Sequence, residues 1–227
     1  RWCGYSRGST SKIKRSFKGG MMIILFGPAG SGKSTQGRTL ADLYGWRWLS
    51  VGQVLRDSGE FDDIMKEGAL VDDATVVRLM DKQIEFAEAE GMEIVLDGYP
   101  RDKEQTEIML EAGSSFFDKL DGAIVLRVPI EELWQRIELR GREDDTKEAL
   151  EKRINIFEQN IGSILDLLRS REIPVYEVDG VGEFDEVTER IRKIFEEIKP
   201  NTPEVFHTDQ LGSIENDANS REKSYGE

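Results

Sequence analysis

Residues 27–34, Gly-Pro-Ala-Gly-Ser-Gly-Lys-Ser, constrain the fold more than any other part of the sequence. They follow the apolar run 22–26 directly and match G-x-x-x-x-G-K-[S/T], in which a strand leads through a glycine-rich turn into a helix. Glycine lets the backbone wrap a phosphate chain, so that successive N–H groups and the helix start face one anion. Lys33 can then reach the β- and γ-phosphates, and the Ser34 hydroxyl can serve a magnesium site. The motif predicts a site for a nucleoside triphosphate.

Apolar and amphipathic segments alternate along the rest of the chain. Strand-like runs lie at residues 22–26, 93–96, 123–128 and 174–178, with a weaker candidate at 46–49. Helical patterns lie at residues 33–43, 73–89, 103–111, 130–139, 147–169 and 184–198. Strands that alternate with helices form right-handed βαβ units and a parallel sheet covered on both faces. The pattern predicts an α/β protein of the P-loop NTPase fold, with a central five-stranded parallel sheet and ligand residues in the turns after its strands.

Composition divides the chain into one folded domain and two flanking segments. Residues 1–20 contain six Lys or Arg and no acidic residue, which resembles a transit peptide, although we favour an extension without folded structure. Residues 200–227 are acidic and poor in apolar side chains, as is typical of a disordered tail. Residues 21–199 then form one domain, with a small lobe at about 50–80 and a short lid at about 140–147.

Charge and residue usage exclude several classes of function. The net charge of -14 disfavours non-specific binding to nucleic acid. No apolar run approaches the roughly 20 residues of a membrane span. Cys3 is the only cysteine and His207 the only histidine, so we expect neither a disulfide framework nor zinc. We expect a protein of the reducing cytoplasm that works as a monomer.

A second chemical signal is the segment Asp97-Gly98-Tyr99-Pro100-Arg101, which follows the strand-like run at 93–96. An aspartate at the end of a buried strand beside a phosphate loop can orient the water molecules of a magnesium ion. The alternative is that Asp97 caps the next helix. Arg101 could hold a phosphate with its planar guanidinium group, or could be a solvated surface side chain. The P-loop favours the magnesium and phosphate roles.

Arginines gather between residues 130 and 153, at Arg136, Arg140, Arg142 and Arg153. Such charges are often a solvated surface laced with salt bridges. Phosphoryl transfer, however, gains most from cations placed around the equatorial oxygens of the phosphoryl group. A short charged corner at 140–147 could close over the phosphates, with Asp144 and Asp145 holding the closed geometry.

In their order, these segments resemble the adenylate kinase family of nucleoside monophosphate kinases. After the P-loop, its members carry S-T/S-G-D-x-L-R, D-G-F/Y-P-R-x-x-x-Q and G-R-x-D-D. This sequence has Ser-Val-Gly-Gln-Val-Leu-Arg at 50–56, Asp-Gly-Tyr-Pro-Arg at 97–101 followed by Gln105, and Arg-Gly-Arg-Glu-Asp-Asp at 140–145. The resemblance covers about residues 21–198, and the corner is similar to that of short-lid members. It implies reversible, Mg²⁺-dependent transfer of a phosphate from ATP to AMP, which gives two ADP.

The resemblance also implies roles for individual residues. On the ATP side it implies contacts by Gly30, Ser31, Gly32, Lys33, Ser34, Thr35, Arg136 and Gly182. On the AMP side it implies contacts by Val51, Arg56, Ala69, Leu70, Val71, Gly98, Tyr99, Pro100, Arg101, Gln105, Arg142 and Arg153. Catalysis would depend on Lys33, Arg101, Arg136, Arg142 and Arg153, and Ser34 and Asp97 would hold Mg²⁺ through water. No side-chain nucleophile is required, because the acceptor phosphate oxygen is already anionic.

Departures from the family motifs keep two alternatives open. Val51 offers no hydroxyl where the family has Thr or Ser, Gln53 replaces an aspartate, and the segment 57–68 is short. A UMP/CMP kinase or another nucleoside monophosphate kinase is therefore an alternative, although Gln105 is similar to adenylate kinases and pyrimidine kinases typically have asparagine there. The alternative of a different class is a P-loop regulatory module that binds nucleotide without transfer, which would leave the arginines without a role.

Overall fold

The computed structural model describes residues 22–67, 69, 71–111, 119–140 and 146–199. The predictions for the two ends of the chain, at 1–20 and 200–227, lie outside the described residues. So do Leu70, Arg142 and the two aspartates at 144 and 145.

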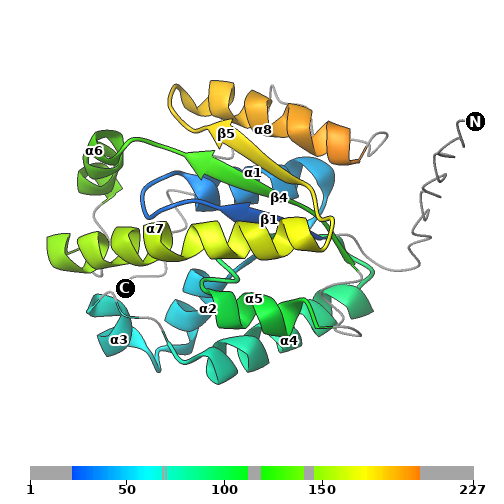
Figure 1. Cartoon of the computed structure of the whole chain (residues 1–227), viewed down its shortest axis with the longest axis horizontal. Coiled ribbons are helices and arrows are strands. Elements are labelled where there is room, and N and C mark those ends of the chain that lie inside the picture. Colours follow the sequence, from blue (N-terminus) through cyan, green and yellow to red (C-terminus); the bar gives the residue numbers. More distant parts are fainter. Residues whose placement is uncertain (1–21, 68, 70, 112–118, 141–145, 200–227) are drawn as a thin grey trace, which may run out of the picture.

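Five parallel strands form one sheet in the order β2-β3-β1-β4-β5 (Figure 1). They are β1 (Met22–Phe26), β2 (Arg47–Ser50), β3 (Ile94–Asp97), β4 (Leu120–Arg127) and β5 (Val175–Asp179). Every residue of β1 and β3 is buried, because a parallel sheet is covered on both faces and its central strands are apolar throughout. The predicted five-stranded parallel sheet is confirmed, and the weak candidate at 46–49 is a strand shifted by one residue.

Helices cover both faces of the sheet (Figure 1). Within the described residues they are α1 (Lys33–Tyr44), α2 (Val51–Ser58), α3 (Asp62–Lys66), α4 (Asp73–Ala89), α5 (Lys103–Met109), α6 (Ile130–Arg140), α7 (Lys147–Ser170) and α8 (Phe184–Ile198). The helices α1 and α8 pack on one face, and α2, α4, α5 and α7 pack on the other. Each predicted helix is present within two residues at either end, whereas α2 and α3 were not predicted as helices.

The side chains of β1 divide the core in two. Because neighbouring residues of a strand point to opposite faces, Met22, Ile24 and Phe26 pack toward α4, α5 and α7, and Ile23 and Leu25 pack toward α1 and α8. A third, smaller cluster joins α6 to α7. The sheet is thus held rigidly from both sides, and its strand ends are fixed in space.

The carboxyl end of β1 is the point where the strand order reverses. The chain first builds β2 and β3 on one side of β1, and then β4 and β5 on the other. Ligands of open α/β sheets bind at such a switch point, outside the carboxyl ends of the strands. The glycine-rich segment begins here, as the sequence predicts.

Capping side chains define the starts of several helices. Asp72 accepts a hydrogen bond from the Thr75 N–H at 3.0 Å at the start of α4, and hydrogen bonds with Thr75 lower the pKa of the Asp72 carboxyl. Asp102 accepts from the Gln105 N–H at 2.9 Å at the start of α5. The two helices therefore begin with well-defined geometry on the same side of the sheet.

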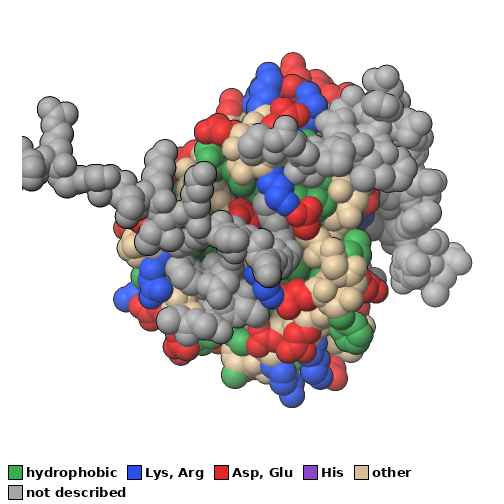
Figure 2. All heavy atoms as spheres, turned by 90° about the vertical axis from the view of Figure 1, so that its right-hand side faces the viewer, with side chains coloured by type: hydrophobic (Ala, Val, Ile, Leu, Met, Phe, Trp, Pro, Cys, Tyr) green, Lys and Arg blue, Asp and Glu red, His purple; other side chains and the backbone are tan. Residues whose placement is uncertain are grey.

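Charged side chains of both signs lie on the face of the molecule that Figure 2 draws. On the face drawn in Figure 2, the visible described side chains are a mixture of acidic and basic groups, with hydrophobic ones in small, separate groups. Within the described ranges, none of the helices has the length and apolar character that crossing a membrane requires.

The aromatic contact between α1 and α8 should carry a large share of the stability. Phe195 is fully buried and stacks on Tyr44, with ring centroids 4.2 Å apart, and lies 4.6 Å from the Trp46 ring. We expect Phe195→Ala to lower the free energy of unfolding in urea by about 3–5 kcal/mol. The matched control Phe86→Ala, at a side chain that is 63% exposed, should change it by less than about 0.5 kcal/mol. Equal effects of the two changes would contradict the predicted role of this cluster.

Candidate functional site

Residues 27–32 link β1 to α1, and Gly27 and Ala29 of this loop line a cleft. Gly32 precedes α1 with φ of 86°, a left-handed conformation that favours glycine. A Cβ on Gly27 would lie 2.5 Å from the Ser31 Oγ and 3.3 Å from the Leu126 Cβ, so a larger residue there would force these side chains to move. The Ser31 N–H donates to the Pro28 carbonyl at 3.2 Å and closes the turn. The first N–H groups of α1 therefore face the loop, where an anion can accept their hydrogen bonds.

Two side chains at the start of α1 line this cleft. The Lys33 ammonium group donates to the Pro28 carbonyl at 3.3 Å, so the lysine lies folded over the loop. Ser34 lines the same cleft. The predicted triphosphate residues of the loop and of the first turn of α1 thus lie together.

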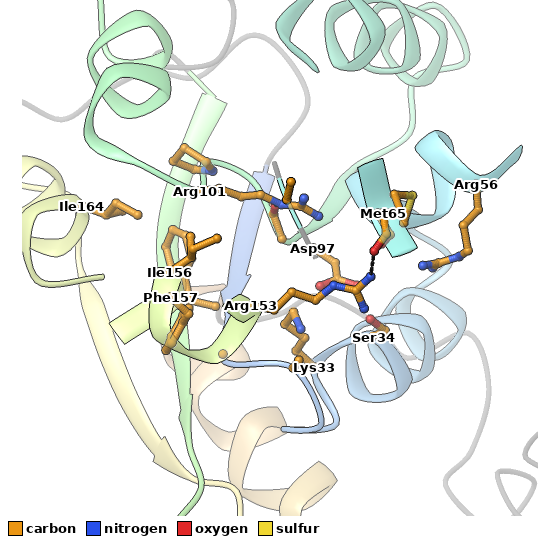
Figure 3. Close-up of a pocket in the computed structure, with 18 residues that line it drawn as sticks. Lys33, Ser34, Arg56, Met65, Asp97, Arg101, Arg153, Ile156, Phe157 and Ile164 are labelled. Carbon is orange, nitrogen blue, oxygen red and sulfur yellow. Dashed lines mark hydrogen bonds between the residues drawn. The ribbon is translucent and has the colours of Figure 1, made fainter. Parts of the chain in front are cut away.

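Asp97 stands at the centre of the cleft, at the carboxyl end of β3 (Figure 3). Its side chain is 1% exposed, and neither carboxylate oxygen accepts a hydrogen bond from any residue in the described part of the chain. A buried carboxylate without partners is costly unless water or a cation satisfies it. Asp97 does not cap the next helix, because Asp102 does. Of the two roles considered for Asp97, the geometry fits orientation of magnesium-bound water.

Cationic side chains from four segments of the chain converge on this carboxylate. Figure 3 shows the heads of Lys33, Arg56, Arg101 and Arg153 directed into the cleft around Asp97. They come from α1, from α2, from the turn after β3 and from α7. Such a cluster of cations in one cleft favours a ligand with several negative charges.

Arg101 is held in place by its own turn. Its Nε donates to the Gly98 carbonyl at 2.9 Å. Burial lowers the pKa of the Arg101 guanidinium group to about 10; Asp97 opposes this shift, and the positive charges of Arg153 and Arg56 add to it. Arg101 is still charged at neutral pH, and an anion beside it would relieve both the burial and the repulsion.

Arg56 and Arg153 come from elements that are distant in sequence. The Arg153 Nη2 donates to the Met65 carbonyl at 2.5 Å, which joins α7 to α3 (Figure 3). The Arg56 Nη2 donates to the Gln53 Oε1 at 3.3 Å, and Gln53 donates in turn to Asp57 at 2.7 Å. Gln53, a departure from the family motif, thus contacts a cleft arginine.

Arg136 joins the phosphate loop to the turn after β5. Its Nη1 donates to the Ser31 carbonyl at 3.5 Å and its Nη2 to the Gly180 carbonyl at 3.0 Å. Glu132, one turn earlier on α6, accepts from its Nε at 2.9 Å. Gly182 follows in the same turn with φ of 123°. The predicted Arg136 and Gly182 are therefore brought to one side of the loop.

The structure places the predicted acceptor-side residues in two groups. Ala69, Gly98 and Pro100 line the cleft. The side chains of Val51, Val71, Tyr99 and Gln105 are buried. Next to Val51, both Ser50 and Gly52 line the cleft and were not among the predicted residues.

An apolar wall of the cleft was also missed. It consists of Met65 on α3 and of Ile156, Phe157 and Ile164 on α7 (Figure 3). A signal was present in the sequence, because Ile156 and Phe157 follow Arg153 by three and four residues and so share its helix face. Apolar side chains beside cations suit a ligand that carries both a base and phosphates.

Comparisons with known proteins agree with this architecture. The family model for adenylate kinase matches residues 25–173. The chain is 36% identical over 185 residues to the adenylate kinase of Micrococcus luteus, a match that covers 74% of this chain and 87% of the relative. It is 35% identical to the adenylate kinase of Thermus thermophilus over 185 residues, or 76% and 96% of the two chains. It is also 35% identical to that of Maricaulis maris over 193 residues, or 78% and 100%. The predicted resemblance is confirmed: the chain belongs to the adenylate kinase family.

Proposed function

We propose that the protein is an adenylate kinase that transfers the γ-phosphate of ATP to AMP in a reversible, Mg²⁺-dependent reaction that gives two ADP. One observation carries the proposal: Lys33, Arg56, Arg101 and Arg153 surround the buried Asp97 in a single cleft. A P-loop alone needs one cation for its triphosphate, whereas this cleft holds enough for a second phosphate site. Family membership supports the same reaction.

The donor half of the site is the loop 27–32 together with the first turn of α1. Its N–H groups and Lys33 would bind the ATP phosphates, and Arg136 would lie beside the nucleotide. Arg136 suits this role because it is hydrogen-bonded both to the loop, at Ser31, and to the turn at Gly180.

The acceptor half is the space between Arg56, Arg101 and the apolar wall. A terminal oxygen of AMP is already an anion, so the protein needs to position it in line with the γ-phosphate and to neutralise charge, with no general base. Arg153, on α7 between the two halves, would stabilise the transferring group. We propose the same bridging role for Arg142 in the short lid.

The residues present fit a magnesium ion. The unpartnered, buried carboxylate of Asp97 and the Ser34 hydroxyl line one cleft, and oxygen ligands are those that Mg²⁺ prefers. When bound, Mg²⁺ would neutralise charge on the β- and γ-phosphate oxygens. Asp97 and Ser34 would hold it largely through water.

Because every proposed group belongs to one chain, we propose a monomeric enzyme, which acts in the cytoplasm.

An acceptor panel tests the function. With ATP and Mg²⁺, we expect kcat/KM for AMP to exceed that for CMP, UMP and GMP by about tenfold or more, because a site built to hydrogen-bond one base leaves polar groups unpaired with another. Higher values for CMP than for AMP would favour the pyrimidine kinase alternative. If no phosphate is transferred to any acceptor, and if a dinucleotide polyphosphate binds no more tightly than ATP, the alternative of a P-loop regulatory module is favoured.

The guanidinium geometry of Arg101 should matter more than its charge. Arg101→Lys keeps the charge but loses the planar pair of donors, so kcat/KM for AMP should fall roughly 10–100-fold while KM for ATP stays within about threefold. Initial rates at varied AMP and ATP measure both. The control Arg171→Lys, at a side chain that donates to the Leu110 carbonyl at 2.8 Å, should leave the kinetics unchanged. A rise in KM for ATP as large as the fall in kcat/KM for AMP would contradict a role of Arg101 that is specific to the acceptor nucleotide.

Asp97→Asn should change the magnesium requirement. The amide keeps the size of the side chain but removes its charge, so the Mg²⁺ concentration for half-maximal activity should rise about tenfold or more. A titration of activity with Mg²⁺ at fixed total ATP measures it. The control Asp166→Asn changes an exposed carboxylate on α7 and should have no effect. An unaltered Mg²⁺ curve in Asp97→Asn would exclude the proposed role.

A further inference from the structure

The side-chain amide of Gln105 is held at both ends. Its Oε1 accepts a hydrogen bond from the Arg101 N–H at 2.9 Å, and its Nε2 donates to the Asp73 Oδ1 at 2.5 Å. Gln105 is fully buried, so water does not compete for these bonds. Asp73 lies 32 residues away in the sequence and belongs to a different helix.

The two anchors can hold the amide in one orientation only. A backbone N–H can only donate, so it requires the amide oxygen, and a carboxylate can only accept, so it requires the amide nitrogen. If the Gln105 amide were turned by 180°, its oxygen would face the Asp73 carboxylate and its nitrogen would face the Arg101 N–H. Both contacts would then be repulsive, and both polar groups would lose their partners in a buried place.

Asp73 is not needed to start its own helix. Asp72 caps α4 through Thr75, and Asp102 caps α5 through the Gln105 backbone. Asp73, at the start of α4, is therefore available to accept the hydrogen bond of the Gln105 side chain, which belongs to the first turn of α5. Burial raises the pKa of the Asp102 carboxyl, and the negative charge of the nearby Asp73 raises it further. Two carboxylates thus lie close together, and the Gln105 side chain donates a hydrogen bond to one of them, Asp73.

The fixed amide still has one N–H and one oxygen lone pair to offer. The outer edge of adenine presents an acceptor, N1, beside a donor, the 6-amino group, and this pair matches a donor and an acceptor in that order. Guanine presents a donor at N1 and an acceptor at O6, so it requires the amide turned by 180°. A glutamine that could turn would serve both purines, whereas a fixed one serves adenine alone.

We propose that Asp73 is a specificity-determining residue, which fixes the Gln105 amide in the orientation that accepts adenine and rejects guanine. This inference rests on the proposed function, since it assigns the acceptor base to Gln105. The cleft reaches Ala69 and Pro100, the latter next to Arg101, one of the two anchors of the amide. Asp73 acts through Gln105 and is a positioning residue for it.

Asp73→Asn in the full chain tests the proposal. An asparagine can accept or donate, so Asp73→Asn removes one of the two anchors and leaves only the Arg101 N–H to oppose the turned amide. The turned orientation should then cost less, and the ratio of kcat/KM for AMP to kcat/KM for GMP should fall at least about tenfold, mainly through a gain with GMP. The ratio of the Kd for GMP to the Kd for AMP, measured by calorimetry, should fall in parallel. Asp73→Ala, which removes the anchor altogether, should lower both ratios in the same direction.

Asp72→Asn is the matched control. It alters the neighbouring carboxylate that caps α4 but leaves an amide oxygen that can accept from the Thr75 N–H, so it should leave the thermal unfolding midpoint nearly unchanged and both ratios unchanged. A double-mutant cycle with Gln105→Leu isolates the coupling: in that background Asp73→Asn should have no further effect on either ratio.

The outcomes separate this inference from the proposed function. Equal losses with AMP and GMP in Asp73→Asn would mean that Asp73 has a merely structural role, and would overturn the inference. So would wild-type protein that binds GMP as tightly as AMP. A wild type that binds AMP in preference to GMP but transfers no phosphate would overturn the proposed function and leave the orientation of Gln105 to be decided by the binding ratios.

Discussion

The parallel pairing of β2, β3 and β1 determines the geometry of the whole cleft. Its register sets Asp97 opposite Leu25 on one side and Ser50 on the other, and the Gly98 N–H reaches the Leu25 carbonyl at 3.5 Å. All three strands run in the same direction, so the turns that follow them meet at one edge of the sheet. A shift by one residue would turn Asp97 to the opposite face and leave the loop without its carboxylate.

The charged side chains at this edge of the sheet lower the stability of the folded protein and favour the binding of a charged ligand. Burial and neighbouring positive charges lower the pKa of Arg101, which means that folding has brought cations together at a cost. Asp97 is likewise buried without a hydrogen bond from the described residues. Such strain persists because the packed core on both faces of the sheet holds the strand ends in place. A ligand with phosphates and a divalent cation would satisfy both kinds of charge together.

Much of this arrangement could be predicted from local pattern. Strand and helix periodicity predicted the sheet, the glycine-rich motif at 27–34 predicted Lys33, and the end of the strand-like run at 93–96 predicted Asp97. The helix α2 was missed because it starts at Val51, directly after β2, and contains Gly52 and Val54, which are weak helix formers. Ser50 and Gly59 at its two ends were the signal that could have revealed it.

Contacts between distant segments could not be predicted in this way. Gln105 was assigned to the acceptor base through the resemblance, but its bond to Asp73 depends on how α4 and α5 pack. Neither spacing nor periodicity relates residues that far apart. The burial of Val51 has the same origin: its place in the motif suggested a ligand contact, and the packing of α2 puts its side chain in the core.

The hydrogen bond from Arg153 to the Met65 carbonyl has a consequence for what can enter the cleft. A main-chain carbonyl is a neutral acceptor, and a phosphate oxygen is a stronger, charged one. A nucleotide can therefore draw the guanidinium group away from α3, whereas a nucleoside of the same shape and base cannot offer an equal exchange. Through this exchange the cleft can favour a charged nucleotide over the corresponding nucleoside, whatever the base.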